Sequence, residues 1–221
     1  EKQFPSLNYY GLKSKGYFSS SVIAETKDHH LPLLIKIFPK PPPNDPLTEK
    51  YTRLEDKYKH FIFPNPLERP NFAPILNVET KTQDDRDSIV IIRQYYPFSL
   101  SERISSLPEL TTIDKVFISF QLLYSVYKLT NRAEFHGNIT FNNILLTSHL
   151  HVFLADPAVY KPTYLQLSDY YRNYIYFFSP QFKRDTDPVY IAPERLDEDA
   201  PYICKYTAEM DTFSTGVVIA Q

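Results

Sequence analysis

The sequence predicts an α+β chain of two lobes, in which a β-rich first part precedes a second part built around one long helix. Apolar runs of strand length recur before residue 95, and the clearest of them is Leu-Leu-Ile-Lys-Ile-Phe at 33–38. Residues 113–133 contain neither glycine nor proline and carry apolar side chains at helical spacing. A polar loop follows at 136–143. We therefore expect one lobe over 1–95 and another over 96–221.

The composition is that of a folded domain. Hydrophobic residues make up 43% of the 221 residues, which is enough for a core. The net charge is −2 and no basic block stands out, so nucleic acid is not an expected partner. Cys204 is the single cysteine, and an intrachain disulfide is therefore impossible. No apolar run approaches the roughly 20 residues that span a bilayer.

The first lobe is expected to contain five strands and one helix. Residues 9–14 and 17–25 indicate two strands joined near Gly16, and 33–38 indicates a third. Residues 73–80 and 88–94 indicate a hairpin around an acidic turn. The prolines at 39–43 predict an extended linker. A charged stretch with helical spacing, 46–61, predicts the helix, and the hinge to the second lobe is expected at 94–97.

In the second lobe, the long helix at 113–133 is expected to pack beneath the polar loop. Its apolar residues at helical spacing are predicted to face the core; they are Ile113, Val116, Phe117, Phe120, Leu123 and Tyr127. Two short strands, 144–147 and 151–154, should then present Asp156.

The polar loop reads His-Gly-Asn-Ile-Thr-Phe-Asn-Asn. The catalytic loop of protein kinases has the form H-R-D-x-K-x-x-N. His136 and Asn143 match its two ends at the right spacing. Asn138 stands where the aspartate accepts the proton of the attacking hydroxyl, and Thr140 stands at the lysine. An amide cannot accept that proton, so the loop predicts the fold of a kinase with impaired chemistry.

Four further signals follow the kinase order. Lys36 lies in a buried-strand pattern, as the phosphate-binding lysine of V-A-I-K does. Asp156-Pro-Ala stands at the place of D-F-G, and Ala192-Pro-Glu194 matches A-P-E. Asp211 lies in a stretch typical of the helix that anchors the catalytic loop. The motifs predict a two-lobed protein-kinase-like fold whose C-lobe is truncated at Gln221, so we expect a piece of a longer protein.

The resemblance is closest to one branch of the kinases. The chain resembles the N-terminal kinase-like domain of the regulatory subunit of the class III phosphatidylinositol 3-kinase, the vacuolar protein sorting fifteen family. The segments that carry it are 93–95, 100–104, 120–123, 136–148, 161–165, 176–178, 190–195 and 208–220. That family usually has H-G-D-I-K-x-E-N and D-F-A. This chain keeps Gly137 but departs at Asn138, Thr140, Asn142 and Pro157.

The resemblance implies a biological setting. It implies a regulatory subunit that binds the phosphatidylinositol 3-kinase catalytic subunit together with autophagy and sorting proteins. It also implies a cytoplasmic protein on endosomal or vacuolar membranes, with membrane contact through residues that precede Glu1.

Candidate nucleotide contacts lie in the first lobe. Lys36 is expected either to hold phosphates of ATP or GTP or to form a structural salt bridge with the helix glutamate, for which Glu55 is the candidate and Glu49 the alternative. The loop 12–22, with Gly16 and Val22, would cover the nucleotide, although one glycine is few for close backbone approach. The other interpretation of this loop is an ordinary hairpin.

Candidate metal ligands lie in the second lobe. Asn143 and Asp156 offer the oxygen ligands that Mg²⁺ prefers, and they would bind it together with the nucleotide. The alternative is that both side chains cap backbone groups. Because Pro157 follows Asp156, the backbone at Asp156 is expected to be extended. His136 is expected to be a packing residue, Glu194 to pair with an arginine, and Asp211 to accept hydrogen bonds from the loop backbone.

Three functions remain open from the sequence. The first is a pseudokinase-type scaffold that holds a nucleotide with little turnover. The second is an active serine/threonine kinase with displaced chemistry, and the third is an interaction module without nucleotide. A general base contributes roughly 10²–10⁴-fold to a rate, and an electrostatic donor contributes a similar factor. Loss of both favours the first function over the second.

Overall fold

The computed structural model describes residues 6–15, 18–41, 51, 54–62, 71–83, 86–157, 161, 163–164, 190–196 and 206–221. The chain forms two compact units. The N-terminal unit comprises Glu1–Arg69 and Ala73–Tyr96, and the C-terminal unit comprises Pro70–Phe72 and Pro97–Gln221. Gly16 and Glu49 lie outside the described residues, as does most of the tyrosine-rich segment after Tyr164.

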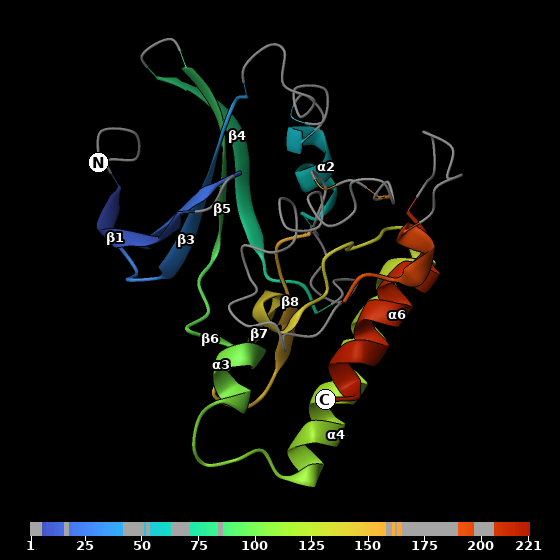
Figure 1. The fold of residues 1–221 in the computed structure, drawn as a ribbon. Coiled ribbons are helices and arrows are strands. Elements are labelled where there is room, and N and C mark those ends of the chain that lie inside the picture. Colours follow the sequence, from blue (N-terminus) through green and yellow to red (C-terminus); the bar gives the residue numbers. More distant parts are fainter. Residues whose placement is uncertain are drawn as a thin grey trace. The chain divides into compact units, whose positions relative to one another are not determined.

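The N-terminal unit is built on an antiparallel sheet of five strands, seen in blue to green in Figure 1. Along the sheet the strands follow the order β1-β2-β3-β5-β4. Their bounds are β1 (Leu7–Lys15), β2 (Ser20–Thr26), β3 (Pro32–Pro39), β4 (Ile75–Gln83) and β5 (Arg86–Gln94). The five predicted strands are therefore confirmed.

The two faces of this sheet bury different side chains, because successive residues of a strand point to opposite faces. One face carries an apolar cluster formed by Ala24, Leu33, Ile35, Val90 and Ile92. Leu34, Lys36 and Phe38 alternate with these residues on β3 and so belong to the other face. Helix α2 (Leu54–His60) packs on that other face, where the rings of Tyr58 and Phe38 are 6.0 Å apart.

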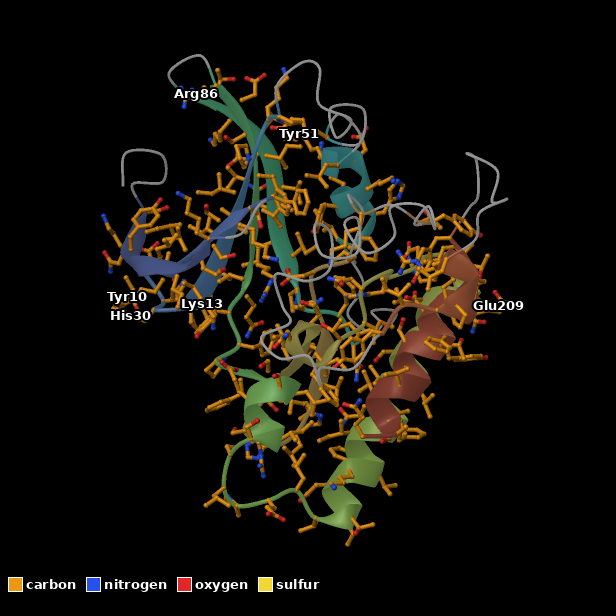
Figure 2. All side chains as sticks on the ribbon, in the orientation of Figure 1. Tyr10, Lys13, His30, Tyr51, Arg86 and Glu209 are labelled. Carbon is orange, nitrogen blue, oxygen red and sulfur yellow. The ribbon has the colours of Figure 1, made fainter. Side chains whose placement is uncertain are left out.

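Strand β1 forms one edge of the sheet and is largely exposed. Figure 2 shows Tyr10 and Lys13 on this strand, with His30 at the nearby turn. The imidazole Nδ1 of His30 lies 3.1 Å from a carboxylate oxygen of Glu25 on β2. Charged and polar side chains on an edge strand discourage pairing with further strands.

The described residues of the C-terminal unit form three helices and a small sheet of three strands in the order β6-β7-β8. Their bounds are β6 (Phe98–Ser99), α3 (Leu100–Ile104), α4 (Thr112–Asn131), β7 (Ile144–Leu146), β8 (Val152–Leu154) and α6 (Ala208–Ile219), with short 3₁₀ turns η1 (Phe141–Asn143) and η4 (Pro193–Arg195). None of the described helices combines the length and the apolar character needed to cross a bilayer.

Helix α4 begins at a reciprocal cap. The Thr111 hydroxyl accepts a hydrogen bond from the Asp114 amide at 3.2 Å, and the Asp114 carboxylate accepts one from the Thr111 amide at 2.9 Å. These bonds satisfy two donors at the helix start that have no partner within the helix. Ser99 and Glu102 form the same arrangement at α3.

The predicted buried face of α4 is wrong. The six apolar residues expected in the core, Ile113, Val116, Phe117, Phe120, Leu123 and Tyr127, are all exposed. The buried residues lie on another face of the helix; they are Ile118, Gln121, Leu122, Ser125, Val126 and Leu129. Both sets recur at three- and four-residue intervals, so periodicity alone could not choose between them. The buried set includes two polar residues because Gln121 and Ser125 satisfy backbone groups, which is invisible in a count of apolar residues.

Adjacent leucines on α4 provide a direct test of this assignment. Leu122 is 0% exposed and Leu123 is 52% exposed. We expect Leu122→Ala to lower the free energy of unfolding by about 2–5 kcal/mol, because it leaves a cavity. Leu123→Ala should change it by less than about 0.5 kcal/mol. Urea unfolding of both variants measures the difference, and equal losses would contradict the assignment of the buried face.

Candidate functional site

The polar loop at 136–143 is held by a carboxylate of helix α6. Asp211 Oδ2 accepts a hydrogen bond from the His136 amide at 2.7 Å, and Oδ1 accepts one from the Gly137 amide at 2.9 Å. The Tyr206 hydroxyl donates to Oδ1 at 3.2 Å. Asp211 is 2% exposed. These bonds are the ones predicted for Asp211, and they fix the backbone at the start of the loop.

Arg195 forms a second anchor that the sequence motifs do not indicate. This buried guanidinium donates from Nε to the Thr163 carbonyl at 2.7 Å and from Nη1 to the Gly137 carbonyl at 3.4 Å. It also lies over the Tyr206 ring, 5.0 Å from its centre. Neighbouring Glu194 is exposed, and its predicted ion pair with an arginine is not found within the described part of the chain. The motif A-P-E predicted a structural role for Glu194, whereas the contacts with the loop are made by Arg195 beside it.

The ring of His136 is a structural element. It is buried, its Nε2 donates to the Ala155 carbonyl at 2.9 Å, and its Nδ1 accepts from the Asn138 amide at 3.3 Å. The ring also lies 5.8 Å from the ring of Phe72. With one nitrogen donating and the other accepting, the ring is neutral. Through its bond to the Ala155 carbonyl, the ring connects the loop to the residue that precedes Asp156.

Burial shifts the pKa values of His136 and Asp211 in opposite directions. Desolvation lowers the pKa of His136 to about 4, with a further lowering from the positive charge of Lys161. Desolvation raises the pKa of Asp211 to about 6, although the hydrogen bonds from His136 and Gly137 act against this rise. In each case burial disfavours the charged form.

Asn138, at the position of the catalytic base, takes part in a network of hydrogen bonds. It is 6% exposed, and its Oδ1 accepts a hydrogen bond from Lys161 Nζ at 2.9 Å. Its Nδ2 lies 3.4 Å from the Asp156 carbonyl. Its own carbonyl accepts from Asn143 Nδ2 at 2.8 Å. The amide is therefore fixed in place but has no basic group to receive a proton.

Thr140, at the position of the catalytic lysine, is also buried and offers no positive charge. Its carbonyl accepts a hydrogen bond from the Asn143 amide at 3.0 Å, which closes the short turn η1. The positive charge near the base position comes instead from Lys161, which lies outside the loop motif. Lys161 belongs to segment 161–165, one of those that carry the family resemblance. Its position along the chain did not predict that its side chain would contact Asn138.

The two predicted metal ligands lie close together in the fold. The Ala155 amide donates to the Asn143 carbonyl at 2.9 Å, and Asp156 follows directly after Ala155. Because Asn143 Nδ2 donates to Asn138, the atom of its amide that suits a cation is Oδ1. No group of three or more His, Cys, Asp or Glu side chains with metal-ligand spacing exists among the described residues. One amide oxygen and one carboxylate suit Mg²⁺ held jointly with phosphates, rather than a cage made of protein ligands alone.

The backbone of Asp156 differs from the prediction. The following Pro157 favoured an extended conformation, but Asp156 has a φ of 60°, in the left-handed region. Such a conformation in a residue other than glycine costs about 1–3 kcal/mol. His30, Ala133 and Leu150 also adopt it. The surrounding bonds of Ala155 to Asn143 and His136 hold the chain in this conformation.

In the N-terminal unit, the predicted pair of Lys36 with Glu55 is not seen. Glu55 Oε1 lies 2.6 Å from Lys59 Nζ, one turn along α2. Its Oε2 accepts a hydrogen bond from the Thr80 hydroxyl of β4. Lys59 and Thr80 lower the pKa of Glu55. The carboxylate thus joins α2 to the sheet and leaves Lys36 to other partners.

Val22 lies on the face of the sheet opposite to Lys36. It pairs with Ile35 across β2 and β3 and packs against the apolar cluster of that face. Ser21 pairs with Lys36, and Ile23 pairs with Leu34, so these residues share the Lys36 face. The prediction that Val22 covers a nucleotide beside Lys36 is therefore wrong, because its side chain lies on the opposite face. Ile23 is the residue of β2 next to Val22 that lies on the Lys36 face. The prediction used the motif position, whereas the strand register decides which side chain shares the face of the lysine.

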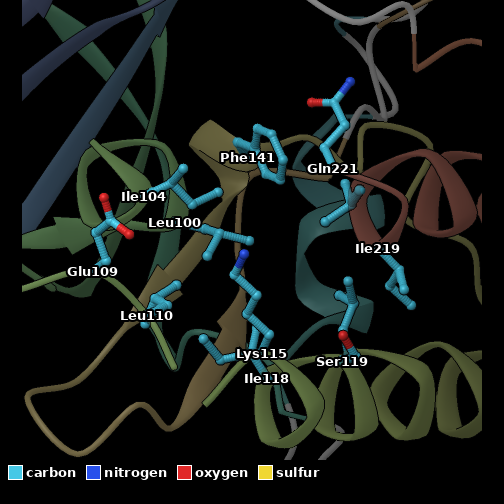
Figure 3. Close-up of a pocket in the computed structure, with 12 residues that line it drawn as sticks. Leu100, Ile104, Glu109, Leu110, Lys115, Ile118, Ser119, Phe141, Ile219 and Gln221 are labelled. Atoms are coloured by element: carbon cyan, nitrogen blue, oxygen red, sulfur yellow. The ribbon is translucent and has the colours of Figure 1, made fainter. Parts of the chain in front are cut away.

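A separate apolar pocket lies between α3, α4 and the end of α6 (Figure 3). Its volume is about 190 Å³, and Leu100, Ile104, Ile118 and Val218 are among its lining residues. Of the polar loop at 136–143, Phe141 is the residue that lines it. The pocket contains none of the polar side chains described above and is not the candidate site.

Replacing Asp211 tests how the loop is anchored. Asp211→Asn removes one acceptor, and the expected loss of stability at pH 7 is about 1–3 kcal/mol. Because the folded-state pKa of Asp211 is raised, the wild-type carboxyl stabilises the fold as the pH falls from about 6 toward 4, and the amide cannot. The deficit of the variant should therefore widen over this range in urea unfolding. Glu109→Gln, which removes an exposed carboxyl outside α6, is the control. A stability deficit of Asp211→Asn that narrows as the pH falls would contradict the assignment.

Comparison with known proteins shows similarity to protein kinases. No family model matches the chain. A "Probable serine/threonine-protein kinase vps15" of Dictyostelium discoideum is 37% identical over 157 residues, covering 68% of this chain and 8% of that protein. A "Putative serine/threonine-protein kinase VPS15" of Komagataella pastoris is 34% identical over 194 residues, covering 86% of this chain and 14% of that protein. The chain thus spans a small part of the length of these relatives.

The solved structure of a MAP kinase, LmaMPK10 from Leishmania major, has the same fold. The TM-score is 0.64 over 99% of this chain and 56% of that one, at 13% sequence identity. The five-stranded antiparallel sheet and the helices of the two units agree with this comparison. The fold and the resemblance predicted from the sequence are confirmed: the chain belongs to the protein-kinase fold and, within it, is similar to the VPS15 serine/threonine-protein kinases.

Proposed function

We propose that this chain is the kinase-like domain of a regulatory subunit of a phosphatidylinositol 3-kinase complex, a pseudokinase that holds a nucleotide with little or no phosphoryl transfer. The complex would act in endosomal or vacuolar sorting and in autophagy, on the cytoplasmic side of those membranes. The partners would be the catalytic subunit and associated sorting proteins. The similarity to VPS15 kinases supports the setting, and the geometry of the loop supports the impaired chemistry.

The single observation that carries the proposal is the state of the base position. Asn138 is buried, its side-chain oxygen accepts a hydrogen bond from Lys161, and its amide has no basic group to receive the proton of a substrate hydroxyl. A missing general base costs roughly 10²–10⁴-fold in rate. Typical kinases turn over about 1–100 times per second. The loss of the base alone would therefore lower turnover to about 10⁻⁴ to 1 per second.

The loop nevertheless keeps the residues that would hold a nucleotide. Asn143 Oδ1 and the Asp156 carboxylate fit Mg²⁺, which would neutralise charge on the phosphates of ATP or GTP. Within the N-terminal unit, Lys36 shares its face of the sheet with Ile23 and Leu34, so a charged group suited to phosphate lies beside apolar side chains. The anchors from Asp211 and Arg195 contact main-chain atoms of the loop, at His136 and Gly137.

One alternative, an active serine/threonine kinase, has a specific observation in its favour. The similar proteins of Dictyostelium and Komagataella are themselves named serine/threonine-protein kinases. Measurable phosphoryl transfer by the unmodified protein, abolished by Lys36→Met, would establish this alternative and overturn the pseudokinase proposal.

The partner in the proposal can be tested by purification. We expect a tagged full-length protein, isolated from its own cells, to bring down a phosphatidylinositol 3-kinase catalytic subunit in near-equal amount, as quantified by mass spectrometry. Recovery of intact bait without any such subunit would defeat the regulatory role, whatever the loop does.

Restoring the base tests the impaired chemistry. Asn138→Asp with Thr140→Lys should raise phosphoryl transfer to a serine peptide by about 10²-fold or more, because the new carboxylate can accept the hydroxyl proton. Radiolabel transfer from ATP measures the rate. Asn142→Asp, the same chemical change at an exposed position of the same loop, is the control and should leave the rate unchanged. An equal gain from the control would contradict the role given to position 138.

A further inference from the structure

Lys161 brings a positive charge to the base position from outside the catalytic-loop motif. Its ammonium lies 2.9 Å from Asn138 Oδ1, and the side chain is only 8% exposed. The two residues are separated by 23 positions in the chain. Burying an ammonium costs free energy unless hydrogen bonds compensate. The bond to Asn138 is one such compensating contact.

The location of this ammonium matches a gap in the loop. Kinase loops carry a lysine two residues after the catalytic aspartate, and here Thr140 stands at that position without a charge. The charge of Lys161 also acts within the loop, since it contributes to the lowered pKa of His136.

The same amide connects Lys161 to the candidate metal ligands. Asn138 accepts from Lys161 through Oδ1, and its Nδ2 faces the Asp156 carbonyl at 3.4 Å. Its carbonyl accepts from Asn143 at 2.8 Å. An ammonium can donate to as many as three acceptors, and Asn138 Oδ1 is one of them. Phosphate oxygens of a nucleotide whose metal is held by Asn143 and Asp156 would lie in this neighbourhood.

We propose that Lys161 donates a hydrogen bond to the terminal phosphate of a bound nucleoside triphosphate and so takes the place of the lysine that is absent at Thr140. This inference rests on the proposed nucleotide-holding function. In this arrangement Asn138 acts as a positioning residue: its amide oxygen holds the ammonium where a carboxylate would hold a catalytic-loop lysine. The site would therefore favour triphosphates over diphosphates.

The test compares affinities for nucleotides that differ only in the terminal phosphate. Calorimetric titration of the full-length protein with Mg·ATP, Mg·ADP, Mg·GTP and Mg·GDP gives each dissociation constant. In the Lys161→Met variant we expect the affinity for the triphosphate to fall about tenfold or more, since a charge-assisted hydrogen bond is lost, while that for the diphosphate stays within about twofold. Lys161→Arg should keep most of the preference.

Two further variants decide between a phosphate contact and a structural role. Thr140→Lys added to Lys161→Met should restore part of the triphosphate preference, and Lys115→Met, on the exposed surface of α4, should leave it unchanged. Equal weakening of triphosphate and diphosphate binding by Lys161→Met, or no effect on either, would overturn this inference alone. If the unmodified protein binds no nucleotide, the nucleotide-holding proposal and this inference both fail.

Discussion

The bidentate contact between the Asp211 carboxylate and two consecutive backbone amides is the interaction on which the candidate site depends. It reaches across 75 residues of sequence and involves only main-chain atoms of the loop. This contact therefore does not depend on which side chains stand at positions 138 and 140. This explains how Asn138 and Thr140 can replace the residues of a working kinase while the frame of the site persists. Arg195 and the His136 ring reinforce the frame from two other directions.

The fold could be predicted from the sequence because several kinase motifs occur in the expected order, and such an order is compatible with few topologies. The sequence was less informative about which face of an element is buried. On α4, two apolar stripes satisfy the same periodicity, and only packing against β8 and α6 separates them. On β2, a shift of one residue moves Val22 to the face away from Lys36, because strand register changes the face of every side chain.

Long-range placement was the second limit of the sequence. Lys161 lies 2.9 Å from Asn138 although 23 positions separate the two residues, and nothing in local spacing encodes that contact. Glu55 was assigned to Lys36 by analogy, whereas Lys59 and Thr80 compete for the same carboxylate at short range. The left-handed backbone of Asp156 overrides the preference imposed by Pro157 because bonds on Ala155 fix the preceding peptide.

The opposite pKa shifts of His136 and Asp211, which adjoin through a backbone hydrogen bond, have a calorimetric consequence. Near pH 5, unfolding leads His136 to take up about one proton and Asp211 to release about one, so the net proton exchange from this pair is close to zero. Heat released or absorbed by buffer ionisation then cancels for the pair. The measured enthalpy of unfolding would carry no contribution from this pair that depends on the choice of buffer, although two buried groups change their protonation.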